Sequence, residues 1–217
     1  ASMPDVGRIV ASVVDAMDLL RFHPEKQRVI LTRGEPLDFY GAGDGKLHAN
    51  GDVFHIKGIN WYGTEGKQMM LEGASVRPIG SLLDFLASNQ FNAMRLLFNM
   101  EDWRDDTAVP KGHFSALLNP ELVGLRYREM LRYIIHAAAQ RGILVLLACH
   151  RLRRFYSDGI HAEWPTGWDG WWFDNAAGLP FGRVQSLWGE IAKFYCGEWN
   201  VFAAGALQAN NRAGGIH

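Results

Sequence analysis

The chain has 217 residues, of which 48% are hydrophobic and 21% are charged, and these proportions exclude disordered, collagen-like and coiled-coil proteins. Lysine and arginine number 22 and aspartate and glutamate 23, so no overall field attracts nucleic acid or an anionic membrane, and we expect neither partner. The 2 cysteines cannot form a disulfide framework, and every apolar run is far shorter than the ~20 residues of a membrane span.

The first 50 residues predict an N-terminal helix followed by a β-hairpin. Apolar residues recur at helical spacing over residues 5–22, and the acidic residues among them argue against a secretory signal peptide there. Two short alternating runs then flank Asn50-Gly51, a dipeptide that favours a two-residue hairpin turn. We predict that residues 1–50 form an N-terminal segment of helix and β-hairpin, and that residues 51–217 form the main domain.

Strand and helix patterns alternate through the main domain. Residues 53–61 predict a strand, and residues 79–90 predict a helix that buries Leu82, Phe85 and Leu86. The later elements are strands at 91–99, 142–150 and 200–207 and a helix at 184–195.

A further helix is predicted to begin at Asn119. Asparagine is a favoured N-cap, Pro120 fits the first turn, and Gly142 ends the pattern.

Repeated strand and helix units of this kind indicate right-handed parallel βαβ connections and an α/β fold. No Gly-x-Gly-x-x-Gly turn and no Walker loop occurs, so a nucleotide-binding open sheet loses its main support. A complete (β/α)8 barrel takes about 250 residues and eight strands. The sequence therefore predicts a partial (β/α)8 TIM barrel of about four βα units.

Candidate site residues follow from that fold, because active residues of such barrels lie where the strands end. Arg95 within an apolar strand requires an anion, either in a site or in a structural ion pair. His150 closes a strand and is interpreted as a site residue or as a satisfied core histidine. Trp61 and Glu65 follow the first strand, although a lone loop acid is usually solvated.

Trp168 and Trp171 lie among proline, glycine and aspartate residues, which is a composition typical of loops. Core aromatics are the common alternative, but loop tryptophans often face a ligand. We therefore expect these two rings to bind the ligand. No histidine, cysteine or carboxylate pattern has metal-ligand spacing, and we expect neither a metal nor a cofactor.

Five segments occur in order over roughly residues 47–208: KGINWYGTEG, FNAMRLLFN, RGILVLLACHRL, WPTGWDGWWFD and EWNVFAAGAL. Together they resemble family 5 of the glycoside hydrolases, the cellulase family. The resemblance implies a (β/α)8 barrel that hydrolyses β-linked polysaccharide with retention. It also implies that Arg95 bonds the nucleophilic carboxylate, that His150 lines the subsite of the scissile sugar, and that the tryptophans stack on sugar rings.

Three departures from the family pattern predict that this chain is inactive as it stands. Ala148 replaces a usual aspartate, and the acid/base glutamate position falls at Ala209 or Asn210. The nucleophilic glutamate belongs on a seventh strand that the chain does not reach. Retaining hydrolysis needs two carboxylates about 5 Å apart, so both catalytic groups are missing.

The leading hypothesis is a cellulase-type domain whose intact parent hydrolyses β-1,4-glucan, with β-linked polysaccharide or oligosaccharide as its partner. The alternative is a non-catalytic carbohydrate-binding pseudoenzyme or a truncated gene product. Unpaired edges of a half-barrel also predict self-association. The resemblance implies an extracellular parent, while the chain itself leaves its compartment open.

Overall fold

The computed structural model describes residues 37–41, 43–154 and 173–205. The predicted helix at 5–22 therefore lies outside the described residues, as do the tryptophans Trp168 and Trp171 and the acid/base position at Ala209 or Asn210. The chain divides into two compact units, residues 1–56 and residues 57–217. The predicted boundary between residues 50 and 51 stays a prediction.

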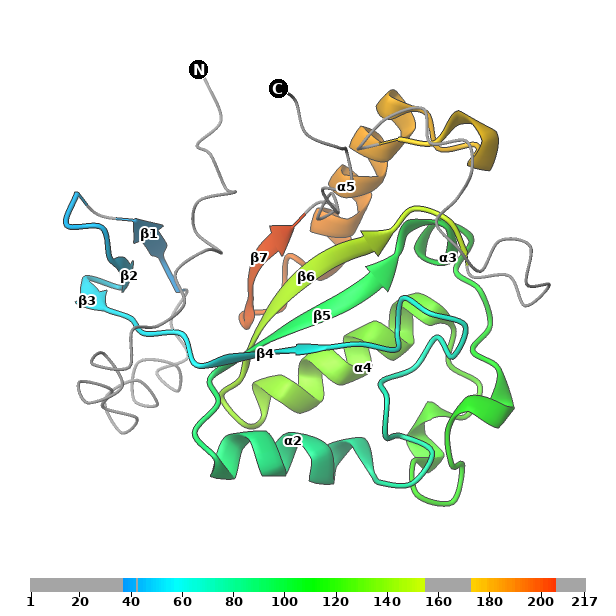
Figure 1. Cartoon of the computed structure of the whole chain (residues 1–217), viewed down its shortest axis with the longest axis horizontal. Helices are drawn as coiled ribbons and strands as arrows, with labels where there is room; N and C mark the ends of the chain where they lie inside the picture. The colour runs from blue at the N-terminus through cyan, green and yellow to red at the C-terminus, as the bar shows by residue number, and fades with distance from the viewer. Residues whose placement is uncertain (1–36, 42, 155–172, 206–217) are drawn as a thin grey trace, which may run out of the picture. The chain divides into compact units, whose positions relative to one another are not determined.

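The first unit contains a three-stranded antiparallel sheet in the order β1-β2-β3 (Figure 1). Its strands are β1 Phe39–Gly41, β2 Leu47–Ala49 and β3 Asp52–Val53. The hairpin predicted at Asn50-Gly51 is confirmed, with φ angles of 49° and 89° that place both residues in the left-handed region of a type I′ turn. Strand β1 was not expected from the sequence.

The second unit is an α/β layer with a four-stranded parallel sheet in the order β4-β5-β6-β7 (Figure 1). The strands are β4 Gly58–Trp61, β5 Ala93–Asn99, β6 Leu144–Arg151 and β7 Val201–Gly205. The helices are α2 Ile79–Ser88, α3 Met100–Asp105, α4 Tyr127–Ala139 and α5 Phe181–Tyr195. Short 3-10 turns occupy Lys111–His113, Pro120–Leu122 and Asn175–Ala177. This alternation confirms the predicted partial (β/α)8 barrel.

The hydrophobic core of the second unit lies between the sheet and its helices. Alternate residues of β5 and β6 belong to it: Met94, Leu96, Phe98, Val145, Leu147 and Cys149. Helices α2, α4 and α5 cover this face with Leu83, Ile134 and Leu187, which are all fully buried. Because side chains alternate along a strand, Arg95 and Leu146 lie on the opposite face, which is called the inner face below.

The predicted strand at 53–61 is wrong in its extent. Asp52–Val53 pairs with the antiparallel sheet as β3, and the parallel strand β4 begins only at Gly58. Between them, the Lys57 N–H donates to the Asn92 Oδ1 atom at 2.8 Å.

The predicted helix start at Asn119 is also wrong. Helix α4 begins at Tyr127, and Pro120–Leu122 forms a 3-10 turn. The buried Asn119 side chain instead accepts from the Ile79 N–H at 2.7 Å and donates to the Ala74 carbonyl at 2.8 Å. Asn119 thereby satisfies the first amide of α2, whose preceding residue is a proline without a capping side chain.

The predicted buried face of helix α2 is rotated from the observed one. Ile79, Leu83 and Leu86 are buried, whereas Phe85 is 65% exposed. The observed stripe follows the four-residue and three-residue steps from Ile79, the first residue of the helix.

Both outer strands of the sheet have one partner each within the described part of the chain. Strand β4 pairs with β5, and β7 pairs with β6. The self-association expected from these edges stays a prediction. In the same described residues, every helix is too short or too polar to cross a membrane.

Candidate functional site

Polar side chains gather on the inner face, where β4 and β6 end and within the middle of β5. Asn60 lies opposite Arg95 in the sheet register, and the Arg95 Nη1 atom donates to Asn60 Oδ1 at 2.8 Å. Glu65 follows β4, and His150 is the penultimate residue of β6. Asn60, Glu65, Arg95 and His150 are called the inner-face set below.

Glu65 is the most deeply buried charged member of this set, with 7% of the residue exposed. Its Oε2 atom accepts from the Gly63 N–H at 2.8 Å, and its Oε1 atom lies 3.5 Å from His150 Nδ1. Burial raises the pKa of Glu65, but contact with His150 and with the backbone amides of Gly63 and Glu65 lowers it by more. The net pKa of Glu65 is therefore below its ordinary value. Glu65 is therefore a carboxylate at neutral pH and not a proton donor.

Arg95 supplies the positive charge of the set. Burial lowers the pKa of its guanidinium, and the field of the Glu65 carboxylate partly restores it. An arginine remains charged under either influence. Asn60 is its one hydrogen-bonding partner within the described residues, so its other N–H donors have no protein acceptor among them.

The turn that carries Glu65 is held by backbone constraints. Gly63 has a φ angle of 118°, and a Cβ atom there would lie 2.3 Å from the Met70 carbonyl oxygen. Thr64, which is fully buried, donates its hydroxyl to the Leu97 carbonyl. These contacts fix the backbone of the two residues that precede Glu65.

Tyr127 connects this turn to the end of β5. Its hydroxyl donates to the Thr64 carbonyl at 2.7 Å and accepts from the Asn99 N–H at 3.0 Å. Complete burial raises the pKa of Tyr127 well above its ordinary value, so the hydroxyl keeps its proton. A residue of helix α4 thus positions two segments at the mouth of the sheet.

Three of the predicted site residues, Glu65, Arg95 and His150, are brought together by the structure. Trp61 is not, because it alternates with Asn60 and packs against the hydrophobic core. Its indole N–H donates to the Glu72 carbonyl at 3.1 Å. The side chains of Trp168 and Trp171 lie outside the described residues, so their predicted role stays a prediction.

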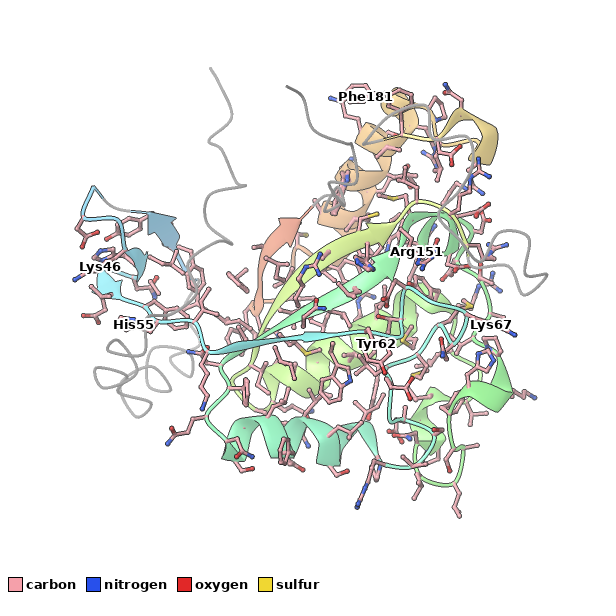
Figure 2. All side chains as sticks on the ribbon, viewed as in Figure 1. Lys46, His55, Tyr62, Lys67, Arg151 and Phe181 are labelled. Atoms are coloured by element: carbon pink, nitrogen blue, oxygen red, sulfur yellow. The ribbon has the colours of Figure 1, made fainter. Side chains whose placement is uncertain are left out.

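Asn60, a member of the inner-face set, and Tyr62, which directly follows β4, were not among the predicted site residues. Tyr62 is 56% exposed, and Figure 2 shows it on the segment that follows β4, with Arg151 at the end of β6. Strand alternation was the signal that could have found Asn60, since it puts residue 60 on one face and Trp61 on the other.

A second polar cluster lies beside the same strand ends, formed by Arg154 with Glu101, Asp102, Asp105 and Thr107, and is called the Arg154 cluster below. Arg154 donates its backbone N–H to Glu101 at 2.6 Å and its Nε atom to Asp102 at 2.5 Å. Its Nη2 atom donates to Asp105 at 2.9 Å and to Thr107 at 2.8 Å. These acids are already engaged in ion pairs and hydrogen bonds.

Asn99, at the end of β5, serves the same segment. Its side chain accepts from the backbone amides of Glu101 and Asp102 and donates to the Arg153 carbonyl at 2.5 Å. Asn99 is therefore the N-cap of α3 and not a free inner-face side chain. Across the residues that the structure describes, no three histidine, cysteine or acidic side chains form a group that could hold a metal ion.

Known proteins similar to this chain are endoglucanases and endocellulases. No family model matches the chain. An endoglucanase of Paenibacillus polymyxa is 26% identical over 143 residues, which cover 66% of this chain and 35% of that protein. The major extracellular endoglucanase of Xanthomonas campestris pv. campestris is 30% identical over 118 residues, covering 54% of this chain and 23% of that protein.

Solved structures give the same result. The endocellulase from Pyrococcus horikoshii, in a complex with cellotetraose, superposes with a TM-score of 0.64 at 25% identity, over 79% of this chain and 43% of that chain. The catalytic domain of the Xanthomonas endoglucanase superposes with a TM-score of 0.59 at 22% identity, which supports the fold alone. The chain thus spans less than half of these relatives and resembles the N-terminal half of a cellulase-type glycoside hydrolase.

Proposed function

We propose that this chain forms the sugar-binding half of a cellulase-type barrel. The inner-face set binds one ring of a β-1,4-linked glucan chain, and the intact parent hydrolyses the glycosidic bond. Taken alone, the chain binds the oligosaccharide without cleaving it.

The observation that carries this proposal is the inner-face set itself. A sugar ring is neutral and presents hydroxyl groups that both donate and accept hydrogen bonds. Arg95 offers unused donors, and Asn60 and His150 offer amide and imidazole groups on the same face. Tyr62, more than half exposed, offers an aromatic surface on the segment between β4 and Glu65. The proposal also includes Trp168 and Trp171 as stacking residues, on the basis of their loop composition.

The similarity to the Pyrococcus horikoshii endocellulase favours a β-linked glucan over other sugars. That protein was crystallised with cellotetraose, and its similarity extends over 79% of this chain. The two relatives found by sequence similarity are likewise named endoglucanases.

Binding without hydrolysis follows from the state of the acids. Retaining hydrolysis needs a proton-donating and a nucleophilic carboxyl group about 5 Å apart. Glu65 is ionised and engaged with Gly63 and His150, and Asp102 is engaged with Arg154. The family's acid/base position holds Ala209 or Asn210, neither of which donates a proton usefully.

Titration with cellotetraose, followed by amide chemical shifts, tests the proposal. Weak saturable binding is expected, with maltotetraose, its α-linked isomer, as the control ligand that binds less. Incubation of the same sample with soluble β-1,4-glucan should release no reducing sugar above background.

Two exposed aromatic residues give a matched pair of variants for the titration. Tyr62→Ala should weaken binding of cellotetraose, whereas Phe85→Ala on the outer surface of α2 should not. Equal affinity for both tetrasaccharides, or an equal response to both variants, would remove the inner face from the proposal. Turnover that survives repurification would overturn the claim that the chain does not hydrolyse.

A further inference from the structure

We propose that Glu65 is a positioning residue that fixes the tautomer of His150, directing the Nδ1–H at its own carboxylate and leaving Nε2 as an acceptor for a sugar hydroxyl. The sugar-binding part of this inference rests on the proposed function. The tautomer does not, because it is a property of the protein without ligand.

The first step is that the Glu65 carboxylate cannot turn away. Its Oε2 atom is held by the Gly63 N–H, and the Met70 carbonyl oxygen and Glu72 amide nitrogen lie where a Cβ atom at Gly63 would be, so the backbone is closely packed there. Thr64 is anchored from both sides, by its hydroxyl to Leu97 and by its carbonyl to the Tyr127 hydroxyl. The second oxygen, Oε1, is therefore presented to His150 in a fixed direction.

The second step concerns the hydrogen on the imidazole. An ionised carboxylate only accepts hydrogen bonds. The His150 Nδ1 atom lies 3.5 Å from Oε1, is buried from solvent and has no other partner. A lone pair at Nδ1 would face the negative oxygen across a dry gap, whereas an N–H there is attracted to it. The neutral ring therefore carries its hydrogen on Nδ1.

The third step gives the consequence at the opposite nitrogen. A neutral imidazole with its hydrogen on Nδ1 has a lone pair on Nε2. The His150 side chain is 31% exposed although Nδ1 is buried, so the accessible part of the ring lies away from Glu65. No described residue bonds Nε2. Nε2 is thus an unused acceptor on the face that carries the donors of Arg95.

Nuclear magnetic resonance of the histidine side-chain nitrogens tests the tautomer directly. The chain has 8 histidines, and loss of one set of signals in His150→Asn assigns His150. In the wild-type chain, at a pH where the His150 ring is neutral, the shifts of a protonated Nδ1 and a bare Nε2 are expected. A bare Nδ1 with a protonated Nε2 would overturn the inference.

Glu65→Gln provides the decisive variant. The amide oxygen can still accept from the Gly63 N–H, which turns the amide NH₂ group toward His150. An NH₂ group donates, so the favoured tautomer of His150 reverses and Nε2 becomes a donor. Reversal in the spectrum, together with a roughly tenfold loss of cellotetraose affinity, is the expected result. An unchanged tautomer in a folded Glu65→Gln protein would overturn the proposal.

A matched control exists elsewhere in the same unit. Glu198 accepts at 2.7 Å from the Nε2 atom of His136 on the exposed side of α4. Glu198→Gln makes the same chemical change at a histidine contact but should leave the His150 signals and the cellotetraose affinity unaltered.

If Glu65→Gln fails to fold, Glu65→Asp keeps the charge while withdrawing it by one methylene group. The His150 signals should then move toward an average of the two tautomers. Signals that stay at the wild-type positions would overturn the proposal. The expected tautomers without any cellotetraose binding would support the role of Glu65 in positioning and refute only the proposed function.

Discussion

Two arginines of the second unit, Arg95 within β5 and Arg154 after β6, are used in different ways. Arg154 contacts three acidic residues and one hydroxyl, and it ties the segment after β6 to helix α3. Arg95 has Asn60 as its one hydrogen-bonding partner within the described part of the chain, although it lies in the middle of an apolar strand. Arg154 is fully engaged in contacts within the protein, whereas Arg95 has one such contact among the described residues.

This difference separates stabilising charges from binding charges. A buried carboxylate such as Asp102 has to keep its cation, because removal of one partner leaves a charge uncompensated. Removal of a half-buried guanidinium with few hydrogen bonds should lower the free energy of unfolding only slightly. The same removal should weaken the binding of a polar ligand that the guanidinium contacts. The comparison therefore predicts opposite responses of stability and binding at the two arginines.

The largest effect is expected from Arg154→Ala. Asp102 is fully buried and would lose the guanidinium that balances it, so the free energy of unfolding should fall by about 3 kcal/mol or more. Urea denaturation followed by circular dichroism measures the change. Arg126→Ala is the control, since Arg126 pairs with Asp106 while 57% exposed and should change stability by less than about 1 kcal/mol. Similar losses in both variants would refute the distinction between the two pairs.

The turn that carries Glu65 should be nearly as sensitive. In Gly63→Ala, the Cβ atom meets the Met70 carbonyl oxygen at 2.3 Å in addition to the strain of a φ angle of 118°. We expect a destabilisation of about 3 kcal/mol by the same measurement. Gly124→Ala separates the two causes, because Gly124 also has a positive φ angle, of 85°, but open space around it. Its cost should be about 1 kcal/mol, from backbone strain alone.

Arg95→Ala should give the reverse of the Arg154 result. The loss of one hydrogen bond to Asn60 should change the free energy of unfolding by about 1 kcal/mol or less. Affinity for cellotetraose, measured by titration, should nevertheless fall roughly tenfold because a charged donor is lost. The Arg126→Ala protein serves again as the control. If Arg95→Ala lowers stability as strongly as Arg154→Ala and leaves binding intact, Arg95 stabilises the fold and does not bind the ligand.

The smallest effect concerns acid. The pKa of Glu65 is lower in the folded chain than its ordinary value, because contact with His150 and backbone amides outweighs burial. The folded state then binds fewer protons than the unfolded state, so Glu65 stabilises the fold above about pH 4.3 and loses this contribution as pH falls through the folded pKa. Arg95 and His150 are the other charged or titratable groups that face it.

Wild-type protein and Glu65→Gln, unfolded with urea from pH 7 down to pH 3, test this dependence. The wild-type advantage should stay nearly constant from pH 7 down to about pH 4.3 and shrink as the solution is acidified further. An advantage that stays constant over the whole series would mean that the Glu65 charge makes no contribution.

Much of the fold could be predicted from the sequence because its signals are local. The apolar run around Val145 required a strand covered by other elements, and the structure has β6 at Leu144–Arg151. The Asn50-Gly51 pair specified its own hairpin, since both residues tolerate positive φ angles. Val184, Leu187 and Ile191 marked the buried face of α5 by helical spacing.

Other features depended on partners far away along the chain. The residues around Asn119 have the pattern of a helix N-terminus. Asn119 nevertheless accepts from the N–H of Ile79, 40 residues earlier, because the tertiary fold brings the first amide of α2 to it. Glu65 reads as a solvated loop acid, and only the parallel alignment of β4 and β6 with β5 brings His150 to it.

Local sequence therefore determined which segments become strands, turns and helices, because backbone propensities and side-chain periodicity act within a few residues. Only the tertiary structure decided which charges meet. Strand register set Asn60 against Arg95, and within the described part of the chain Arg95 has that one bonding partner while Arg154 is fully engaged. These outcomes depend on distances across the sheet, which no spacing along the chain encodes.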